Sequence, residues 1–148
     1  MILIPFPEMK LLTETLALAM GAELRTLDWH HFPDGESLMT LPGDLDGADV
    51  ALLATLRNPD HHALPLRFAA ATAREMGARR VGLIAPYLGY MRQDSRFEAG
   101  QAVSARLFAH FLGESFDWLV TVDPHLHRIA RLEEVFPIPA VRAVSAPL

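Results

Sequence analysis

The sequence predicts an α/β fold with a largely parallel sheet flanked by helices. Short apolar runs alternate with segments of helical periodicity along the whole chain. Several of the runs are continuously apolar, which is typical of strands buried on both faces of a parallel sheet. Glycines stand directly after the helical segments, where they favour helix termination. We therefore expect a β-α-β-β-α-β-α-β order in one domain.

The first elements are a strand at 2–4 and a helix at 10–20. Leu12, Leu16 and Met20 recur on one face of the helix at helical spacing, so they are expected to face the core. Prolines close to the strand make the N-terminal apolar run too short and too interrupted for a signal peptide.

Two strands, at 23–27 and 37–41, are expected to flank a turn centred on Pro33-Asp34-Gly35. The uninterrupted apolar run at 49–54 predicts a central strand buried on both faces. A hairpin followed by a central strand is therefore expected in this part of the chain.

Two further helices are expected, at 64–76 and 101–112. Pro65 fits the first of them only in its first turn, because proline has no N–H to donate. The remaining strands are expected at 81–85, 118–122 and 140–144, the last of them after a short helix. The core-facing stripe of the last long helix is expected to be Val103, Leu107 and Phe111.

Composition excludes several classes of protein. The chain has 148 residues, of which 51% are hydrophobic, so it can bury a sizeable core as one domain. The absence of cysteine excludes a disulfide scaffold, a thiolate nucleophile and a Cys-ligated zinc site, and it fits a cytoplasmic protein. A net charge of −5 argues against nucleic-acid binding. No apolar run approaches the roughly 20 residues that a membrane helix needs.

Ligands of open parallel sheets bind outside the carboxyl ends of the strands, so polar residues after strands are the candidates for chemistry. Arg92, Gln93 and Arg96 follow the predicted strand at 81–85. Arginine binds phosphate oxygens through paired N–H groups, and the amide of Gln93 both donates and accepts. The alternative is that 86–96 is a solvated surface loop.

A second candidate is the turn that contains Phe32, Asp34 and Glu36. Phe32 offers a ring for stacking on a base, and the carboxylates can accept hydrogen bonds from an exocyclic amine or a sugar hydroxyl. The alternative interpretation is a hairpin turn, for which Gly35 supplies a positive φ.

A third candidate follows the predicted strand at 118–122. Asp123 and His125 are two residues apart, so an extended backbone would direct both side chains to one side, where they could hold a divalent ion or its water shell. Zinc bound by His125 and His127 is the sharper alternative, but a third ligand is missing. The simplest alternative is that Asp123 caps a following helix.

Two other polar groups follow predicted strands or lie in predicted loops. The segment 57–60, Arg-Asn-Pro-Asp, either closes the same crevice or forms a proline turn. The pairs His30-His31 and His61-His62 are expected to lie in loops exposed to solvent.

Taken together, the three stretches resemble the N-terminal half of the ribose-phosphate pyrophosphokinase family, also called phosphoribosyl pyrophosphate synthetases. The segment 32–36 resembles the family's Phe-x-Asp-Gly-Glu turn. The segment 86–94 resembles its Pro-Tyr-x-x-Tyr-x-Arg-Gln-Asp motif, and 123–125 resembles its Asp-x-His magnesium segment. The motifs agree in order and spacing over nearly the whole chain.

The resemblance implies a fold like the type I phosphoribosyltransferases and transfer of pyrophosphate from Mg-ATP to C1 of ribose 5-phosphate, forming phosphoribosyl pyrophosphate and AMP. It also implies a homo-oligomer, because the hairpin turn would reach a neighbouring subunit's site. The implied roles are adenine and ribose contacts for Phe32, Asp34 and Glu36, ATP contacts for Arg92 and Gln93, a place beside Mg²⁺ for Asp123 and His125, and a catalytic loop containing Arg96.

The sequence also departs from the family pattern. It has no acidic Asp-Asp…Thr-Gly loop for ribose 5-phosphate, and its single lysine is Lys10 in the first helix. We therefore expect residues 1–148 to be the N-terminal, ATP-side domain, inactive without an absent C-terminal domain. The alternatives are a non-catalytic regulatory or nucleotide-binding relative that pairs with an active synthetase, and a stand-alone phosphoribosyltransferase.

Overall fold

A six-stranded, wholly parallel sheet forms the centre of the molecule in the computed structural model, which describes residues 1–146. The strand order is β2-β1-β5-β6-β7-β8, and β3 and β4 form a separate antiparallel hairpin. The strands are β1 (Ile2–Pro5), β2 (Glu23–Leu24), β3 (Asp28–His31), β4 (Ser37–Thr40), β5 (Asp49–Leu53), β6 (Arg80–Ala85), β7 (Trp118–Val122) and β8 (Ala140–Ala143). The helices are α1 (Lys10–Met20), α2 (Pro59–Glu75) and α3 (Ser104–Ser115), with 3₁₀ turns η1 (Pro7–Met9) and η2 (Leu132–Glu134).

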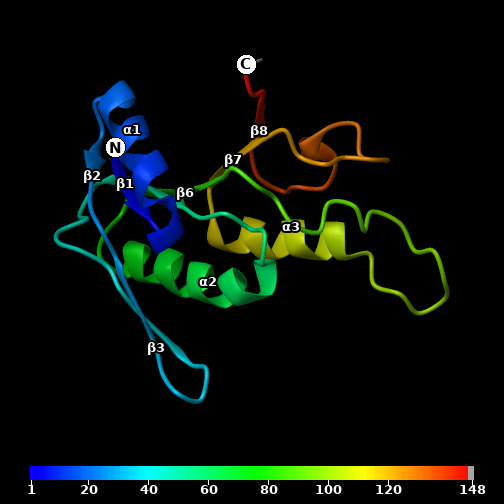
Figure 1. Ribbon diagram of the computed structural model, residues 1–148, viewed down its shortest axis with the longest axis horizontal. Coiled ribbons are helices and arrows are strands. Elements are labelled where there is room, and N and C mark those ends of the chain that lie inside the picture. The colour runs from blue at the N-terminus through cyan, green and yellow to red at the C-terminus, as the bar shows by residue number, and fades with distance from the viewer. Residues whose placement is uncertain (147–148) are drawn as a thin grey trace.

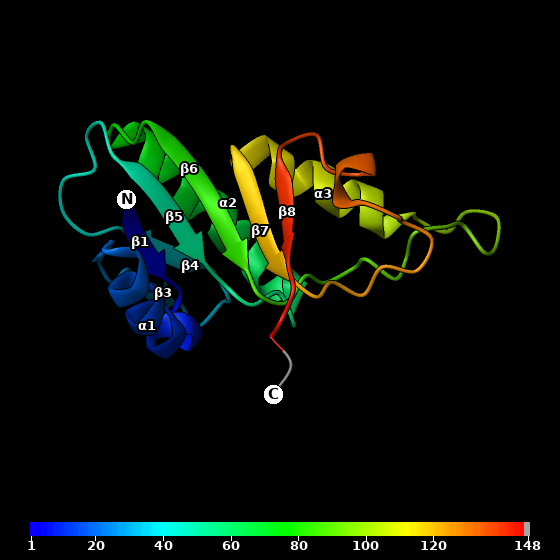
Figure 2. The ribbon, with the colours of Figure 1, turned by 90° about the horizontal axis from the view of Figure 1, so that it is seen from above.

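Helices cover both faces of the sheet. Figure 2 shows α1 on one face and α2 with α3 on the other. Alternate residues of β1 belong to different cores: Ile2 and Ile4 pack on the α2 side, and Leu3 packs on the α1 side. The prediction of a largely parallel α/β sheet flanked by helices is confirmed.

The predicted hairpin is correct in its turn and wrong in its first strand. Residues 23–24 pair in parallel with β1, and the partner of β4 is β3. The turn is closed by the N–H of Phe32, which donates to the carbonyl of Glu36 at 2.8 Å, and Gly35 has φ 91°. Figure 1 shows the hairpin extending beyond α2, away from the sheet.

The helices differ from prediction in their starts and in their buried faces. α2 begins at Pro59, five residues earlier than expected, so Pro65 lies buried inside the helix and not in its first turn. Leu12, Met20 and Leu107, which were expected in the core, are 47%, 51% and 62% exposed. The buried positions are instead mostly small: Thr13 and Ala17 of α1, and Ala105, Phe108, Ala109 and Leu112 of α3.

Both buried residues of α1 are small, and one of them is polar. The hydroxyl of Thr13 donates to the carbonyl of Met9 at 2.7 Å, which satisfies this polar group inside the core. Within residues 1–146, no helix has the length and apolar character required to cross a membrane.

Candidate functional site

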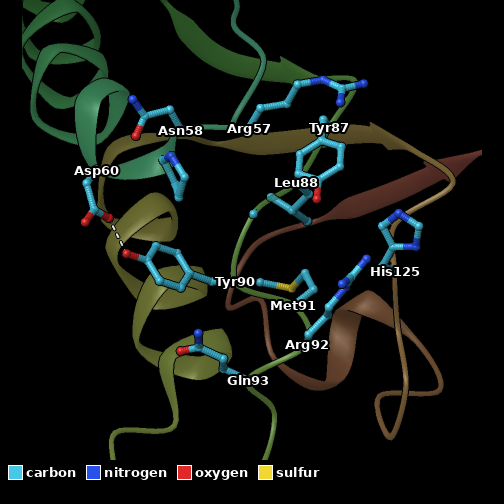
Figure 3. A pocket seen from close by; sticks show the side chains of 12 residues that line it. Arg57, Asn58, Asp60, Tyr87, Leu88, Tyr90, Met91, Arg92, Gln93 and His125 are labelled. Carbon is cyan, nitrogen blue, oxygen red and sulfur yellow. Dashed lines mark hydrogen bonds between the residues drawn. The ribbon is translucent and has the colours of Figure 1, made fainter.

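A pocket of about 360 Å³ lies where the loops after β5, β6 and β7 meet, at the carboxyl ends of three adjacent strands (Figure 3). This is the edge at which open parallel sheets bind ligands. The β5 loop contributes Arg57 and the start of α2. The β6 loop contributes residues from Tyr87 to Gln93, and the β7 loop contributes His125.

The β5 and β6 loops are held together by their backbones. The N–H of Leu56 donates to the carbonyl of Tyr87 at 2.9 Å. A Cβ on Gly89 would come within 2.7 Å of the carbonyl oxygen of Leu56 and 3.0 Å of Pro59. Only glycine therefore allows this close approach, which forms one wall of the pocket.

The β6 loop turns sharply at Tyr90, which has φ 68°, a backbone conformation that is uncommon outside glycine. Its hydroxyl donates to the carboxylate of Asp60 in the first turn of α2, and its ring lies 5.0 Å from that of Phe108. The N–H of Gln93 donates to the carbonyl of Tyr90 at 3.1 Å. This turn leaves Arg92 and Gln93 exposed at the pocket.

Asp94 joins the β6 loop to the β7 loop. Its carboxylate accepts hydrogen bonds from the backbone N–H of Arg128 at 2.8 Å and from the guanidinium of the same residue at 2.9 Å. The backbone hydrogen bond, with the guanidinium beside it, lowers the pKa of Asp94. The segment with Arg92 is thereby fixed relative to the segment with His125.

Three of the predicted site residues come together in the pocket: Arg92, Gln93 and His125. Asp123 does not join them. It has φ 38° rather than an extended backbone, and its carboxylate accepts hydrogen bonds from the backbone N–H and the hydroxyl of Ser145. The expectation that Asp123 and His125 point to one side along an extended strand is therefore wrong, and these hydrogen bonds lower the pKa of Asp123.

The other predicted site residues lie elsewhere in the chain. Arg96 is in the long loop between β6 and α3, which Figure 1 shows extending outward, and its Nε donates to the carbonyl of Gln101 at 2.7 Å. Phe32 is at the hairpin turn, 40% exposed. Asp34 and Glu36 line a groove of about 660 Å³ between the hairpin and α2, separate from the pocket of Figure 3.

The expectation that the histidine pairs lie in loops is wrong, whereas the expected exposure to solvent is confirmed for His30, His31 and His61 and is wrong for His62. His31 belongs to β3 and His61 and His62 belong to α2, and their rings pack around Trp29. His31 and His61 are stacked with their centroids 5.3 Å apart. The buried His62 ring contacts Glu8 through Nε2 at 2.7 Å.

The site residues for which the sequence predicted no role are the two tyrosines, Tyr87 and Tyr90. Both lie inside the segment 86–96, whose position after a strand was the available signal. Arg57 and Asp60 were expected either to close the crevice or to form a turn, and they line the pocket. Among residues 1–146, no group of three His, Asp or Glu side chains could hold a metal ion.

Comparison with known proteins gives consistent results. A family model described as the N-terminal domain of ribose phosphate pyrophosphokinase matches residues 1–115. Ribose-phosphate pyrophosphokinase of Halobacterium salinarum is 38% identical over 136 residues, 92% of this chain and 47% of that protein. The enzyme of the same name from Saccharolobus solfataricus is 38% identical over 114 residues, 76% of this chain and 39% of that protein.

Among solved structures, phosphoribosylpyrophosphate synthetase of Mycobacterium smegmatis matches with a TM-score of 0.85 and 21% identity. The match covers 97% of this chain and 48% of that one, and at this identity it shows a shared fold. The chain thus spans about half the length of the curated relatives named here.

Proposed function

The chain belongs to the ribose-phosphate pyrophosphokinase family, a family of enzymes, and from this membership we propose that it is the ATP-side domain of a pyrophosphotransferase. The proposed reaction transfers pyrophosphate from Mg-ATP to the C1 hydroxyl of ribose 5-phosphate, with phosphoribosyl pyrophosphate and AMP as products. This reaction supplies a precursor for nucleotide biosynthesis. The single observation that carries the proposal is the pocket containing Arg92, Gln93 and His125 at the carboxyl ends of three strands.

The chemistry of these side chains suits a nucleotide. The guanidinium of Arg92 can bind phosphate oxygens through two N–H groups, and the amide of Gln93 can donate to and accept from a base edge or a sugar hydroxyl. Pyrophosphoryl transfer depends on positioning and on neutralising charge more than on covalent chemistry. We assign Arg96 to neutralisation of the transferred group, from a loop long enough to approach a bound nucleotide.

Mg²⁺ fits this site only as part of the substrate, Mg-ATP. Asp123 is engaged by Ser145, so His125 is the one proposed ligand of the pair that faces the pocket. Mg²⁺ keeps several waters and is usually held by substrate phosphates, so it needs no complete protein cage. We therefore propose that the nucleotide brings the ion and that His125 lies beside it.

The hairpin residues suggest a site shared between copies. Phe32, Asp34 and Glu36 are presented on a projecting turn and do not line this chain's own pocket. We propose a homo-oligomer in which this turn contacts adenine and ribose in a neighbouring copy's pocket. Mixing two variants tests this idea. Phe32→Ala chains and Arg92→Ala chains should each bind ATP weakly. In mixed oligomers, the intact turn of an Arg92→Ala chain can meet the intact pocket of a Phe32→Ala chain, so some wild-type sites should return. No gain on mixing would overturn the shared site.

Ribose 5-phosphate is proposed to bind residues outside these 148, because the sequence lacks the family's acidic Thr-Gly loop and has Lys10 as its one lysine. The purified chain should therefore release no AMP from Mg-ATP and ribose 5-phosphate. A non-catalytic partner of an active synthetase is the alternative. It would be favoured if the chain altered AMP production by an active family member.

Titration calorimetry with Mg-ATP tests the binding function directly. Arg92→Ala should weaken binding roughly tenfold or more, because it removes a charge-assisted contact. The matched control is Arg106→Ala, which removes an exposed arginine of α3 outside the pocket. Equal affinities of wild type and Arg92→Ala would contradict the proposed site.

A further inference from the structure

Arg57 and Arg92 lie on opposite sides of the pocket (Figure 3). It follows β5, and Arg92 follows β6, so the two guanidinium groups come from neighbouring strands of the sheet. In Figure 3 the ring of Tyr87 lies between them, next to His125. The Tyr87 and His125 ring centroids are 6.1 Å apart.

The structure holds Arg57 in place through its neighbours. The guanidinium carbon lies 4.9 Å from the centroid of the Tyr87 ring, within the range of a cation–π contact. The backbone hydrogen bond from Leu56 to Tyr87 fixes the residue before Arg57 to the same loop. This contact is made to the face of a ring and uses no hydrogen bond of the guanidinium, so the N–H groups of Arg57 can bind another partner.

No acidic side chain of residues 1–146 neutralises either guanidinium. Neither Arg57 nor Arg92 has a carboxylate oxygen within 4 Å in that part of the chain, whereas Arg25, Arg67, Arg74, Arg79 and Arg128 each have one. The acidic side chain that lines the pocket is Asp60, and its carboxylate accepts the hydroxyl of Tyr90. The two arginines outnumber this carboxylate, so the pocket lining has a net positive formal charge in a protein of net charge −5.

We propose that Arg57 and Arg92 together bind the polyphosphate chain of the nucleotide, with Arg57 as a second phosphate contact across the Tyr87 ring. A chain of linked phosphates can contact both of these separated cations at once, whereas a single phosphate suits the pair less well. This inference rests on the proposed nucleotide function and adds to it the residue that selects a triphosphate over a monophosphate. Arg57 acts by binding, and it takes no part in a covalent step.

Calorimetry with three probes tests the assignment: Mg-ATP, AMP and inorganic tripolyphosphate. Arg57→Ala should weaken Mg-ATP and tripolyphosphate roughly tenfold or more, because each loses a charge-assisted contact, and should change AMP binding by much less. Arg57→Lys keeps the charge and loses the planar fork of N–H groups, so its affinities should fall between those of wild type and Arg57→Ala. Arg106→Ala is the control for loss of a positive charge elsewhere on the surface.

The outcomes separate this inference from the proposed function. If Arg92→Ala weakens Mg-ATP binding and Arg57→Ala does not, the role of Arg57 is wrong and the nucleotide site stands. If Arg57→Ala weakens AMP as much as Mg-ATP, Arg57 supports the pocket in general and the selective role is overturned. If the wild-type chain binds neither Mg-ATP nor tripolyphosphate, both proposals fail. If Arg57→Ala lowers the Tm, Arg57→Gln replaces it in the same binding comparison. Glutamine retains most of the side chain and removes the charge.

Discussion

The hydroxyl of Tyr90 donates a hydrogen bond to the carboxylate of Asp60, which lies 30 residues earlier in the chain (Figure 3). The bond connects the first turn of α2 to the loop after β6, and both residues line the pocket. The hydrogen bond to the carboxylate raises the pKa of Tyr90 above its ordinary value. Because Tyr90 also has φ 68°, this contact holds the turn from which Arg92 and Gln93 extend.

Tyr90→Phe should weaken Mg-ATP binding several-fold while lowering the free energy of unfolding by roughly 1 kcal/mol, the usual contribution of one hydrogen bond. The change removes the hydroxyl and keeps the ring against Phe108. A double-mutant cycle with Asp60→Ala, which removes the acceptor, is the control. The two effects should be less than additive, because each variant removes the same bond. Full additivity in calorimetry would contradict a positioning role for this pair.

Gly82→Ala tests the packing of the sheet below the pocket. A Cβ on Gly82 of β6 would come within 1.9 Å of the indole ring of Trp118 on β7. Overpacking of this kind costs about 1–3 kcal/mol, and this overlap falls on a rigid ring, so we expect the upper end of that range. Urea denaturation should show the loss as a lower midpoint with an unchanged slope.

Trp118→Leu provides the matched test, because a smaller side chain makes room for the added methyl group. Gly82→Ala should cost much less in the Trp118→Leu background than in the wild type. An equal loss in both backgrounds would show that the indole ring is not what excludes a side chain at this position.

The strands and the family resemblance could be predicted because both depend on short local patterns. Continuous apolar runs predicted β5, β6 and β7 nearly to their observed ends, and three motifs in order predicted the family that the comparisons confirm. The pocket position also followed from local order, because polar residues directly after a strand mark the carboxyl edge of a parallel sheet. Arg92, Gln93 and His125 were found in this way.

Features that depend on neighbours from distant parts of the chain were not predictable. Periodicity identified the helices but chose their larger apolar residues as the buried face, whereas contact with the sheet selected Thr13 and Ala17. The backbone of Asp123 depends on Ser145, 22 residues later, and nothing in Asp-Pro-His signals a φ of 38°. Likewise, the burial of His62 depends on Glu8, 54 residues earlier.

Asp94→Ala should weaken Mg-ATP binding several-fold, because Asp94 ties the Arg92 segment to the β7 loop through two hydrogen bonds with Arg128. Glu98→Ala, in the exposed loop that follows, is the control for loss of a carboxylate and should leave binding unchanged. Calorimetry with Mg-ATP measures both. If Asp94→Ala binds as wild type does, the link between the two loops does not organise the pocket.

The contact between Glu8 and His62 should make stability depend on pH in a predictable direction. Burial alone would lower the pKa of His62, but hydrogen bonds to Glu8 and to the carbonyl of Asn58, with the charge of Glu8, raise it on balance. Burial would likewise raise the pKa of Glu8, but the His62 contact and backbone hydrogen bonds lower it on balance.

A raised histidine pKa stabilises the fold fully below the ordinary value of 6.5 and loses that effect as the pH rises through the folded value. A lowered carboxyl pKa stabilises above 4.5 and loses that effect as the pH falls. The pair should therefore contribute most between these two ordinary values. His62→Gln should cost about 1 kcal/mol or more in unfolding free energy near pH 5.5 and distinctly less near pH 8.5.

His61→Gln is the matched variant, because the neighbouring His61 should show the opposite sign. Burial, followed by the charges of His62 and His31, lowers the pKa of His61, so the folded chain resists its protonation. His61 therefore takes stability away as the pH falls below 6.5, and His61→Gln should stabilise the chain near pH 5.5 relative to pH 8.5. Urea midpoints at the two pH values measure both variants. Parallel shifts of His61→Gln and His62→Gln would contradict the opposite pKa shifts of these two adjacent rings.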